Sequence, residues 1–154
     1  TDAGVIQLAT SDGTRSGTTD GISMLGIFAG VQYSDSTGRP SLSPFWPAST
    51  AGTDIIAWVY DDPATIFDVQ YDNPAAGTTV QTAVGEQCDW VTTAPGGATA
   101  VGLSATKLTA IQATQAQFQI TGIAGGVDNA LTDAFVTVTV RMNEAQYKAP
   151  VASV

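Results

Sequence analysis

The sequence contains no histidine and a single cysteine, Cys88, among its 154 residues. Without histidine the chain lacks the commonest general base, metal ligand and pH switch of proteins. A Ser–His–Asp triad, a Cys–His pair and a histidine-bound zinc site are therefore excluded. One cysteine cannot form a disulfide within the chain, and no lysine lies beside Cys88 to activate its thiol. We interpret Cys88 as a small packed side chain rather than a nucleophile.

Basic residues are also scarce, because only 5 Lys and Arg stand against 14 Asp and Glu, for a formal net charge of −9. A surface of this sign repels phosphate backbones, so we expect no nucleic acid partner. The apolar runs are all shorter than the roughly 18 residues of a membrane span, so we expect no membrane partner. The sequence starts at Thr1 instead of methionine. The possibility that an N-terminal arm or a signal peptide precedes Thr1 therefore stays open.

Apolar residues mostly alternate with polar ones, which is the period of half-buried β-strands. Three segments are predicted to be such strands. The first is residues 66–71, with Phe67, Val69 and Tyr71 inward, and the second is residues 117–121, with Phe118 and Ile120 inward and Gln117, Gln119 and Thr121 outward. The third is residues 134–142, with Val136, Val138, Val140 and Met142 inward. These segments indicate a β protein with a substantial core.

Two further segments, residues 25–33 and 54–60, are apolar on both faces. In the second segment Ile56, Trp58 and Tyr60 share one face, and the other carries Ile55, Ala57 and Val59. Strands of this kind either lie at the centre of a layered fold or lie under a partner chain. Both interpretations stay open at this point.

Turn sequences rich in Asp, Gly and Pro separate the segments at the spacing of an all-β domain. Residues 33–39 predict a β-hairpin with residues 34–38 as its loop. Residues 104–115 fit either a helix or a strand with an irregular loop, since their threonines weaken a helix. No repeat or linker divides the chain. The sequence therefore predicts one all-β domain over residues 1–154, a compact β-sandwich or β-barrel with long loops and little or no helix.

Candidate catalytic and metal-binding groups are few. Asp61 and Asp62, followed by Pro63, could hold Ca²⁺ through carboxylate oxygens. The pattern is more typical of a turn, because the spaced acids of a calcium loop are absent. Asp128 and Asp133 indicate a polar loop in the same way.

Residues for hydrolysis are present but not in a recognisable arrangement. Lys107 and Lys148 lie in no motif of a Ser–Lys dyad, and the carboxylates of Asp62, Asp68 and Glu86 show no glycosidase spacing. We expect no enzymatic activity, no catalytic residue, no metal and no cofactor.

Aromatic residues cluster in the stretch from Ser43 to Pro47, where two prolines bracket Phe45 and Trp46. Proline cannot donate a hydrogen bond within a central strand, so this stretch is predicted at a sheet edge or in a rigid loop. Large aromatic side chains are enriched at interfaces between proteins. The candidate interface residues are Phe45, Trp46, Ile56, Trp58 and Tyr60.

Several stretches taken in order resemble a known family. They are residues 25–33 (LGIFAGVQY), 35–39 (DSTGR), 45–50 (FWPAST), 54–63 (DIIAWVYDDP) and 67–70 (FDVQ), with a weaker similarity at residues 143–148 (NEAQYK). This succession is similar to a family of small structural proteins of tailed bacteriophages, especially marine and cyanobacterial phages, that behave as capsid decoration (cement) proteins.

The resemblance implies a non-enzymatic virion protein that binds the major capsid protein on the capsid exterior and stabilises the shell across subunit seams. It also implies synthesis in the host cytoplasm and a homo-oligomer, with a trimer favoured. Two alternatives stay open. One is a phage tail or fibre component, and the other is a carbohydrate-binding β-sandwich in which Trp46 or Trp90 stacks on a sugar ring.

Overall fold

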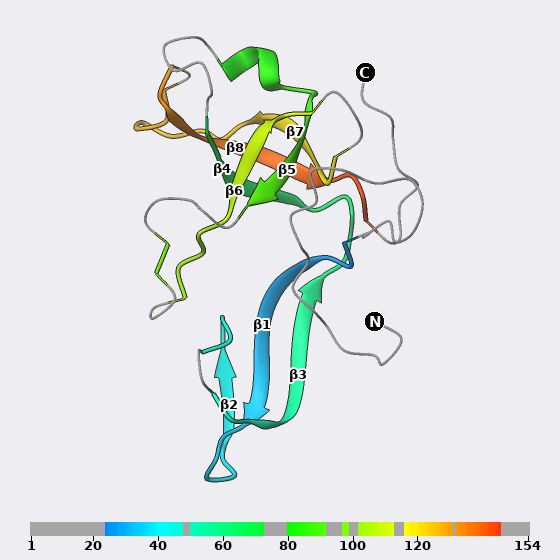
Figure 1. Ribbon diagram of the computed structural model, residues 1–154, viewed down its shortest axis with the longest axis vertical. Helices are drawn as coiled ribbons and strands as arrows, with labels where there is room; N and C mark the ends of the chain where they lie inside the picture. The colour runs from blue at the N-terminus through cyan, green and yellow to red at the C-terminus, as the bar shows by residue number, and fades with distance from the viewer. Residues whose placement is uncertain are drawn as a thin grey trace.

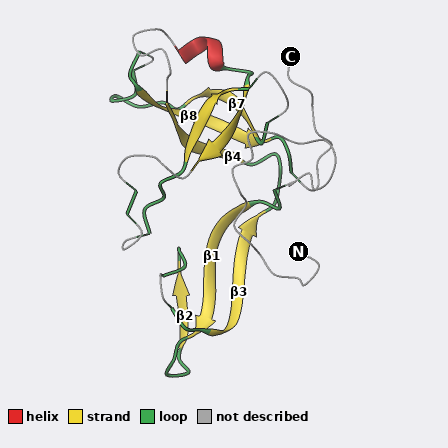
Figure 2. Cartoon of the chain, viewed as in Figure 1, coloured by secondary structure: helices red, strands yellow, loops and turns green. Residues whose placement is uncertain are grey.

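The computed structural model describes residues 24–47, 50–72, 80–91, 97–98, 102–112, 116–130 and 132–145. Within these ranges the chain is almost entirely β, which confirms the predicted fold class. The elements in chain order are β1 (Ile27–Ser34), β2 (Pro40–Ser43), β3 (Thr53–Tyr60), β4 (Ile66–Asp72), the 3-10 helix η1 (Val80–Ala83), β5 (Gln87–Val91), β6 (Lys107–Ile111), β7 (Phe118–Ile123) and β8 (Phe135–Met142). Figures 1 and 2 show two groups of strands, a barrel and a separate sheet.

Strands β4 to β8 close into a barrel in the order β4-β6-β5-β7-β8. Strand β4 pairs antiparallel with β8 and parallel with β6, and the other neighbours are antiparallel. Pairing of β4 with β8 joins the two ends of this order, so the barrel has no free edge strand. Of the two architectures that the sequence left open, the structure therefore shows a barrel.

The interior of the barrel follows from the alternation of the three predicted strands. In β8 the inward Val136, Val138, Val140 and Met142 are all 0 % exposed. They belong to one buried cluster with residues of the other barrel strands, among them Tyr71, Leu108, Phe118 and Ile120. The period of two thus predicted both the strands and the face that each one buries.

The prediction that Gln117 points outward is wrong, because this residue is buried with 2 % exposure. It lies just before β7, and its backbone N–H donates to Oδ1 of the buried Asp89 at 3.2 Å. The helix alternative for residues 104–115 is also wrong. This segment contains β6, whose Lys107 and Leu108 pair with β4 on one side and with β5 on the other.

The first three strands form what we call the arm sheet, in the order β2-β1-β3. Strands β1 and β2 are the predicted hairpin, although their pairing extends to Ser34 and Pro40, so the loop is residues 35–39. Asp35 stabilises this loop, because its Oδ1 accepts hydrogen bonds from the backbone N–H groups of Thr37 at 2.8 Å and Arg39 at 3.0 Å. In Figure 1 the arm sheet extends away from one end of the barrel.

The arm sheet joins the barrel at the root of β1 and β3. Before β1, buried Met24 donates its backbone N–H to the carbonyl of Glu144 at 2.8 Å and packs into the barrel core. Next to it, Gly26 approaches β3 so closely that a Cβ at this position would lie 2.2 Å from the carbonyl oxygen of Tyr60. At the end of β3, the ring of Tyr60 packs against that of Phe67 on β4, with centroids 6.3 Å apart. The root is therefore packed even though the rest of the arm sheet stands clear of the barrel.

Candidate interaction surface

One face of the arm sheet is apolar and open. Cross-strand partners in a sheet point to the same side, and alternate residues along a strand share a face. The register aligns three rows on this face: Leu42–Gln32–Ile56, Gly30–Trp58 and Ile27–Tyr60. We call Leu42, Ile56, Trp58 and Tyr60 the apolar face.

The side chains of the apolar face are about half exposed or more. Leu42 is 71 % exposed, Ile56 53 %, Trp58 46 % and Tyr60 56 %. Together they present on the order of 500 Å² of mainly apolar surface, given the typical size of such side chains. Apolar patches of this size lie at the upper end of what a soluble monomer exposes, and they are often functional.

Charged groups of the arm sheet lie at its ends and outside the rows of the apolar face. Asp35 and Arg39 are in the tip loop, where hydrogen bonds from Thr37 and from the Arg39 N–H lower the pKa of Asp35. Asp54 occupies a bulge at the start of β3 with a φ of 52°, and its carboxylate accepts a hydrogen bond from the Ser34 hydroxyl at 3.3 Å. The four side chains of the apolar face are uncharged, and the carboxylate of Asp54 borders the face beside Ser34.

The opposite face of the arm sheet is covered by the chain itself only in part, because Phe28, which pairs with Val59 there, is 42 % exposed and Ile55 is 53 % exposed. Val31 on this face is 1 % exposed. Trp46 packs edge-on against Tyr33, with ring centroids 5.3 Å apart. The ring of Phe45 lies so close to Gly102 that a Cβ there would be 2.1 Å from it. As predicted, the aromatic stretch follows an edge strand, β2.

The five predicted interface residues thus divide between two places. Ile56, Trp58 and Tyr60 lie together on the apolar face, whereas Phe45 and Trp46 lie beyond β2 and contact their own chain. The interpretation of residues 54–60 as a strand buried on both faces is wrong within the described chain. Leu42 was not predicted, although the alternation of Pro40, Ser41, Leu42 and Ser43 could have indicated it once the hairpin register was known.

The acidic candidates occupy turns. Asp62 accepts a hydrogen bond from the backbone N–H of Ala64 at its Oδ1, at 2.8 Å, and its carbonyl accepts one from Thr65 at 3.0 Å. This geometry confirms the turn interpretation of the Asp61–Asp62 pair. Asp133 likewise accepts from the N–H of Ala130 at 3.2 Å within a loop. In the described ranges, no group of three or more Cys, Asp or Glu side chains is placed to hold a metal ion.

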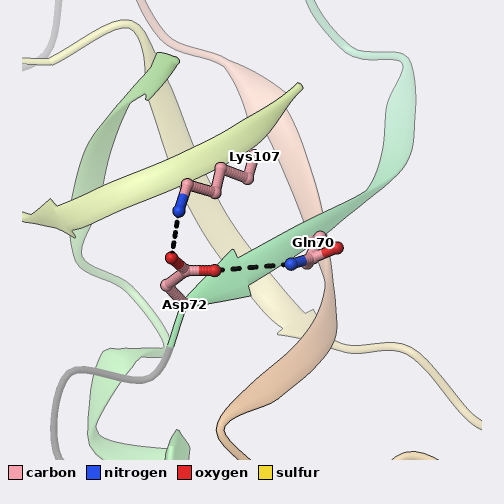
Figure 3. A network of polar contacts seen from close by, with 3 residues as sticks. All are labelled: Gln70, Asp72 and Lys107. Carbon is pink, nitrogen blue, oxygen red and sulfur yellow. Dashed lines mark hydrogen bonds and ion pairs between the residues drawn. The ribbon is translucent and has the colours of Figure 1, made fainter. Parts of the chain in front are cut away.

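Lys107 is paired with a carboxylate. Figure 3 shows its ammonium group directed at Asp72, whose other oxygen accepts a 3.4 Å hydrogen bond from the side chain of Gln70. The ion pair bridges β4 and β6, the parallel neighbours of the barrel. A Ser–Lys dyad needs a neutral lysine as its base, so this pairing disfavours that role for Lys107. Lys148 lies outside the described residues.

Cys88 is packed in the barrel core with 0 % exposure, as predicted. Burial raises the pKa of its thiol to about 12, and the negative charges of Asp89 and Glu86 act in the same direction. Such a thiol is protonated at neutral pH, which makes it a poor nucleophile there.

The aromatic residues considered for sugar stacking are not arranged as a flat platform. Trp90 is only 8 % exposed. Trp46 is 42 % exposed, but its ring is inclined by 63° to its neighbour Tyr33. A sugar ring stacks on an open aromatic face, so Trp90 is unsuited to this role.

No protein-family model, curated protein or solved structure matches this chain. Among the described residues, no helix has the length and apolar character to cross a membrane.

Proposed function

We propose that this chain is a non-enzymatic structural protein of a tailed-phage virion, and specifically a head decoration protein. It binds the outer surface of the capsid, contacts the major capsid protein and stabilises the shell across subunit seams. The main support for this proposal is the apolar face of the arm sheet, because an exposed apolar surface of this kind is suited to binding a neighbouring protein subunit. The similarity to phage structural proteins falls mainly on β1, the tip loop and β3, which are the elements that build this face.

The energetics of the face suit a protein that binds in many copies. Burying about 500 Å² at about 25 cal/mol per Å² gives roughly 12 kcal/mol at most. Association itself costs roughly 4–15 kcal/mol in lost translational and rotational freedom. A single isolated contact is therefore weak, whereas a homo-oligomer, such as the trimer that the resemblance implies, gains avidity on the repeating lattice of a shell.

The charge of the chain also supports a position outside the shell. A formal net charge of −9 opposes contact with packaged DNA, whose backbone is negative. It does not oppose binding through the apolar face, since Leu42, Ile56, Trp58 and Tyr60 are uncharged.

Shell binding tests the proposal directly. The purified chain is mixed with shells of its source phage that lack it, and bound protein is measured by co-sedimentation, with cryo-electron microscopy to locate it. We expect saturable binding and density on the capsid exterior at subunit seams. Density on the tail would replace the head position by the tail or fibre alternative, and a particle without density for the chain would contradict the proposal.

A matched pair of variants makes the test specific to the apolar face. Ile56→Asp puts a carboxylate at the centre of the face and is expected to weaken shell binding at least about 10-fold. Val127→Asp adds the same charge in a barrel loop where the side chain is fully exposed, at 103 %, and is expected to bind like the unmodified chain. Equal loss of binding in both variants would show that charge alone governs binding and that the face does not.

A further inference from the structure

The two edges of the arm sheet differ in how well they are protected from pairing with another polypeptide. Unpaired N–H and C=O groups at a sheet edge are protected in proteins by short strands, prolines, charges or bulges. Strand β2 has four residues, begins with Pro40 and is followed by Pro44. Strand β3 has eight residues and contains neither proline nor lysine. The bulge at Asp54 protects only its start, so the edge from Ile56 to Tyr60 is unprotected.

We propose that the free edge of β3 binds an extended segment of a partner polypeptide by strand addition, and that this segment carries basic residues at its ends. Figure 1 shows β1 between β2 and β3, and in the described part of the chain β3 pairs with β1 and with no other strand. Every second residue of β3 therefore directs its N–H and C=O groups away from the sheet. The inference goes beyond the proposed function, because it concerns the edge of the sheet and requires no capsid.

The exposure of β3 on both of its faces favours an occupant beside the strand over one that covers a single face. On the apolar face Ile56 and Trp58 are 53 % and 46 % exposed. On the other face Ile55 is 53 % exposed, and Phe28, which pairs with Val59, is 42 % exposed. A partner packed on one face would leave the other open. An added strand places its alternate side chains beside both faces at once.

Carboxylates at both ends of β3 define the charge of the incoming segment. Asp54 lies near the start of the strand, Asp61 and Asp62 follow directly after its end, and all three are exposed. The side chains from Ile55 to Tyr60 are uncharged. Lysine or arginine at the ends of the added segment would meet the carboxylates, and apolar or threonine side chains between them would meet the uncharged strand. A second copy of β3 is disfavoured, because in either direction it would bring its own carboxylates to these ends.

Peptide binding to the full chain tests the proposal. The probe is a capped synthetic peptide of about the length of β3, in which valine and threonine alternate between one lysine at each end. We expect saturable binding with a Kd below about 100 µM, measured by calorimetry at low salt. The same peptide with methylated central backbone nitrogens keeps its side chains and charges but loses its donors, and it should bind at least about 10-fold more weakly. Absence of binding, or equal binding of both peptides, would overturn strand addition.

A matched pair of charge variants tests the basic ends of the segment. Asp61→Lys places a cation at the end of β3 and is expected to weaken binding of the unmethylated peptide at least about 3-fold at low salt. Asp128→Lys makes the same change in an exposed loop of the barrel and is expected to bind like the unmodified chain. Equal affinities of the two variants would contradict the assignment of basic ends.

Hydrogen exchange of the full chain identifies the strand that takes the peptide and separates this inference from the proposed function. With saturating peptide, the amides of β3 should exchange at least about 10-fold more slowly, while those of β2 stay unchanged. Protection of β2 instead of β3, or of neither strand, would overturn the inference. A chain that binds shells but not the peptide would refute strand addition and leave the decoration role standing. A chain that binds the peptide at β3 but no shell would support the free edge and contradict the decoration role.

Discussion

The buried thiol of Cys88 should make the stability of the barrel fall at alkaline pH. Burial raises its pKa to about 12 from an ordinary value of 9.0. Between these two values the thiol is protonated in the folded chain and ionised in the unfolded chain. The unfolded state then binds fewer protons, so the free energy of unfolding falls as pH rises. The thiol contributes fully to the free energy of unfolding below about pH 9. Because the loss is about 1.36 kcal/mol per pH unit above that, the free energy of unfolding is lower by roughly 2.5 kcal/mol at pH 11.

The assay is urea unfolding followed by tryptophan fluorescence at pH 8, 9, 10 and 11, on the unmodified chain and on Cys88→Ala. Alanine leaves a small cavity whose cost does not depend on pH, and every other side chain is the same in the two chains. The difference in stability between the two chains should therefore shrink by about 2.5 kcal/mol over this range. Tyr71 also has a raised pKa, mainly through burial, and Tyr71→Phe in both chains removes its contribution. A difference that stays constant from pH 8 to pH 11 would refute the reasoning.

Three further outcomes are expected. Leu108→Ala removes a core side chain with 0 % exposure and should cost about 2–5 kcal/mol in urea unfolding, whereas Ile111→Ala on the same strand, 40 % exposed, should cost much less; equal losses would contradict the barrel core. Gly26→Ala forces a Cβ against the backbone of β3 and should raise hydrogen exchange in β1 and β3 while β7 and β8 stay protected; unchanged exchange in the arm sheet would count against the packed root. Lys107→Met should cost less than about 1 kcal/mol in thermal unfolding at neutral pH, because Lys107 and Asp72 are 18 % and 33 % exposed; a loss of several kcal/mol would show that this ion pair is effectively buried.

The barrel was predictable where one face of a strand is buried and the other is not. In β8 every second residue is apolar, and each of those side chains is buried. Strands β4 and β7 follow the same rule through Phe67, Val69, Phe118 and Ile120. In these strands the chemical pattern and the burial pattern have one cause, the contact of a single face with the core.

Strand β5 escaped prediction because polar side chains are buried within it. Gln87 and Asp89 are 1 % and 4 % exposed, which removes the alternation on which a strand prediction depends. Their partners are remote in sequence. The Gln87 side-chain oxygen accepts hydrogen bonds from the Ala116 N–H at 2.9 Å and from the Asn143 amide at 2.8 Å. Polar groups satisfied over such separations leave no local signal.

The candidate surface was predictable in part. The period of two places Ile56, Trp58 and Tyr60 on one face of β3, and the structure agrees. Whether that face packs in a core or lies open could not be decided, because both situations select large apolar residues. The contribution of Leu42 depends on the offset of the β1–β2 hairpin, which only the pairing of Ser34 with Pro40 reveals.

Closure of the barrel by β4 and β8 has a consequence for synthesis on the ribosome. The nascent chain releases residues 27–60 well before residues 135–142 emerge, so the arm strands are available while the barrel still lacks its last described strand. Pairing between such distant segments is slow compared with hairpin formation. Neighbouring nascent chains on one polysome would then contact each other through the exposed apolar strands of their arm sheets. A chaperone that binds β3 until the chain is released would raise the yield of correctly folded protein.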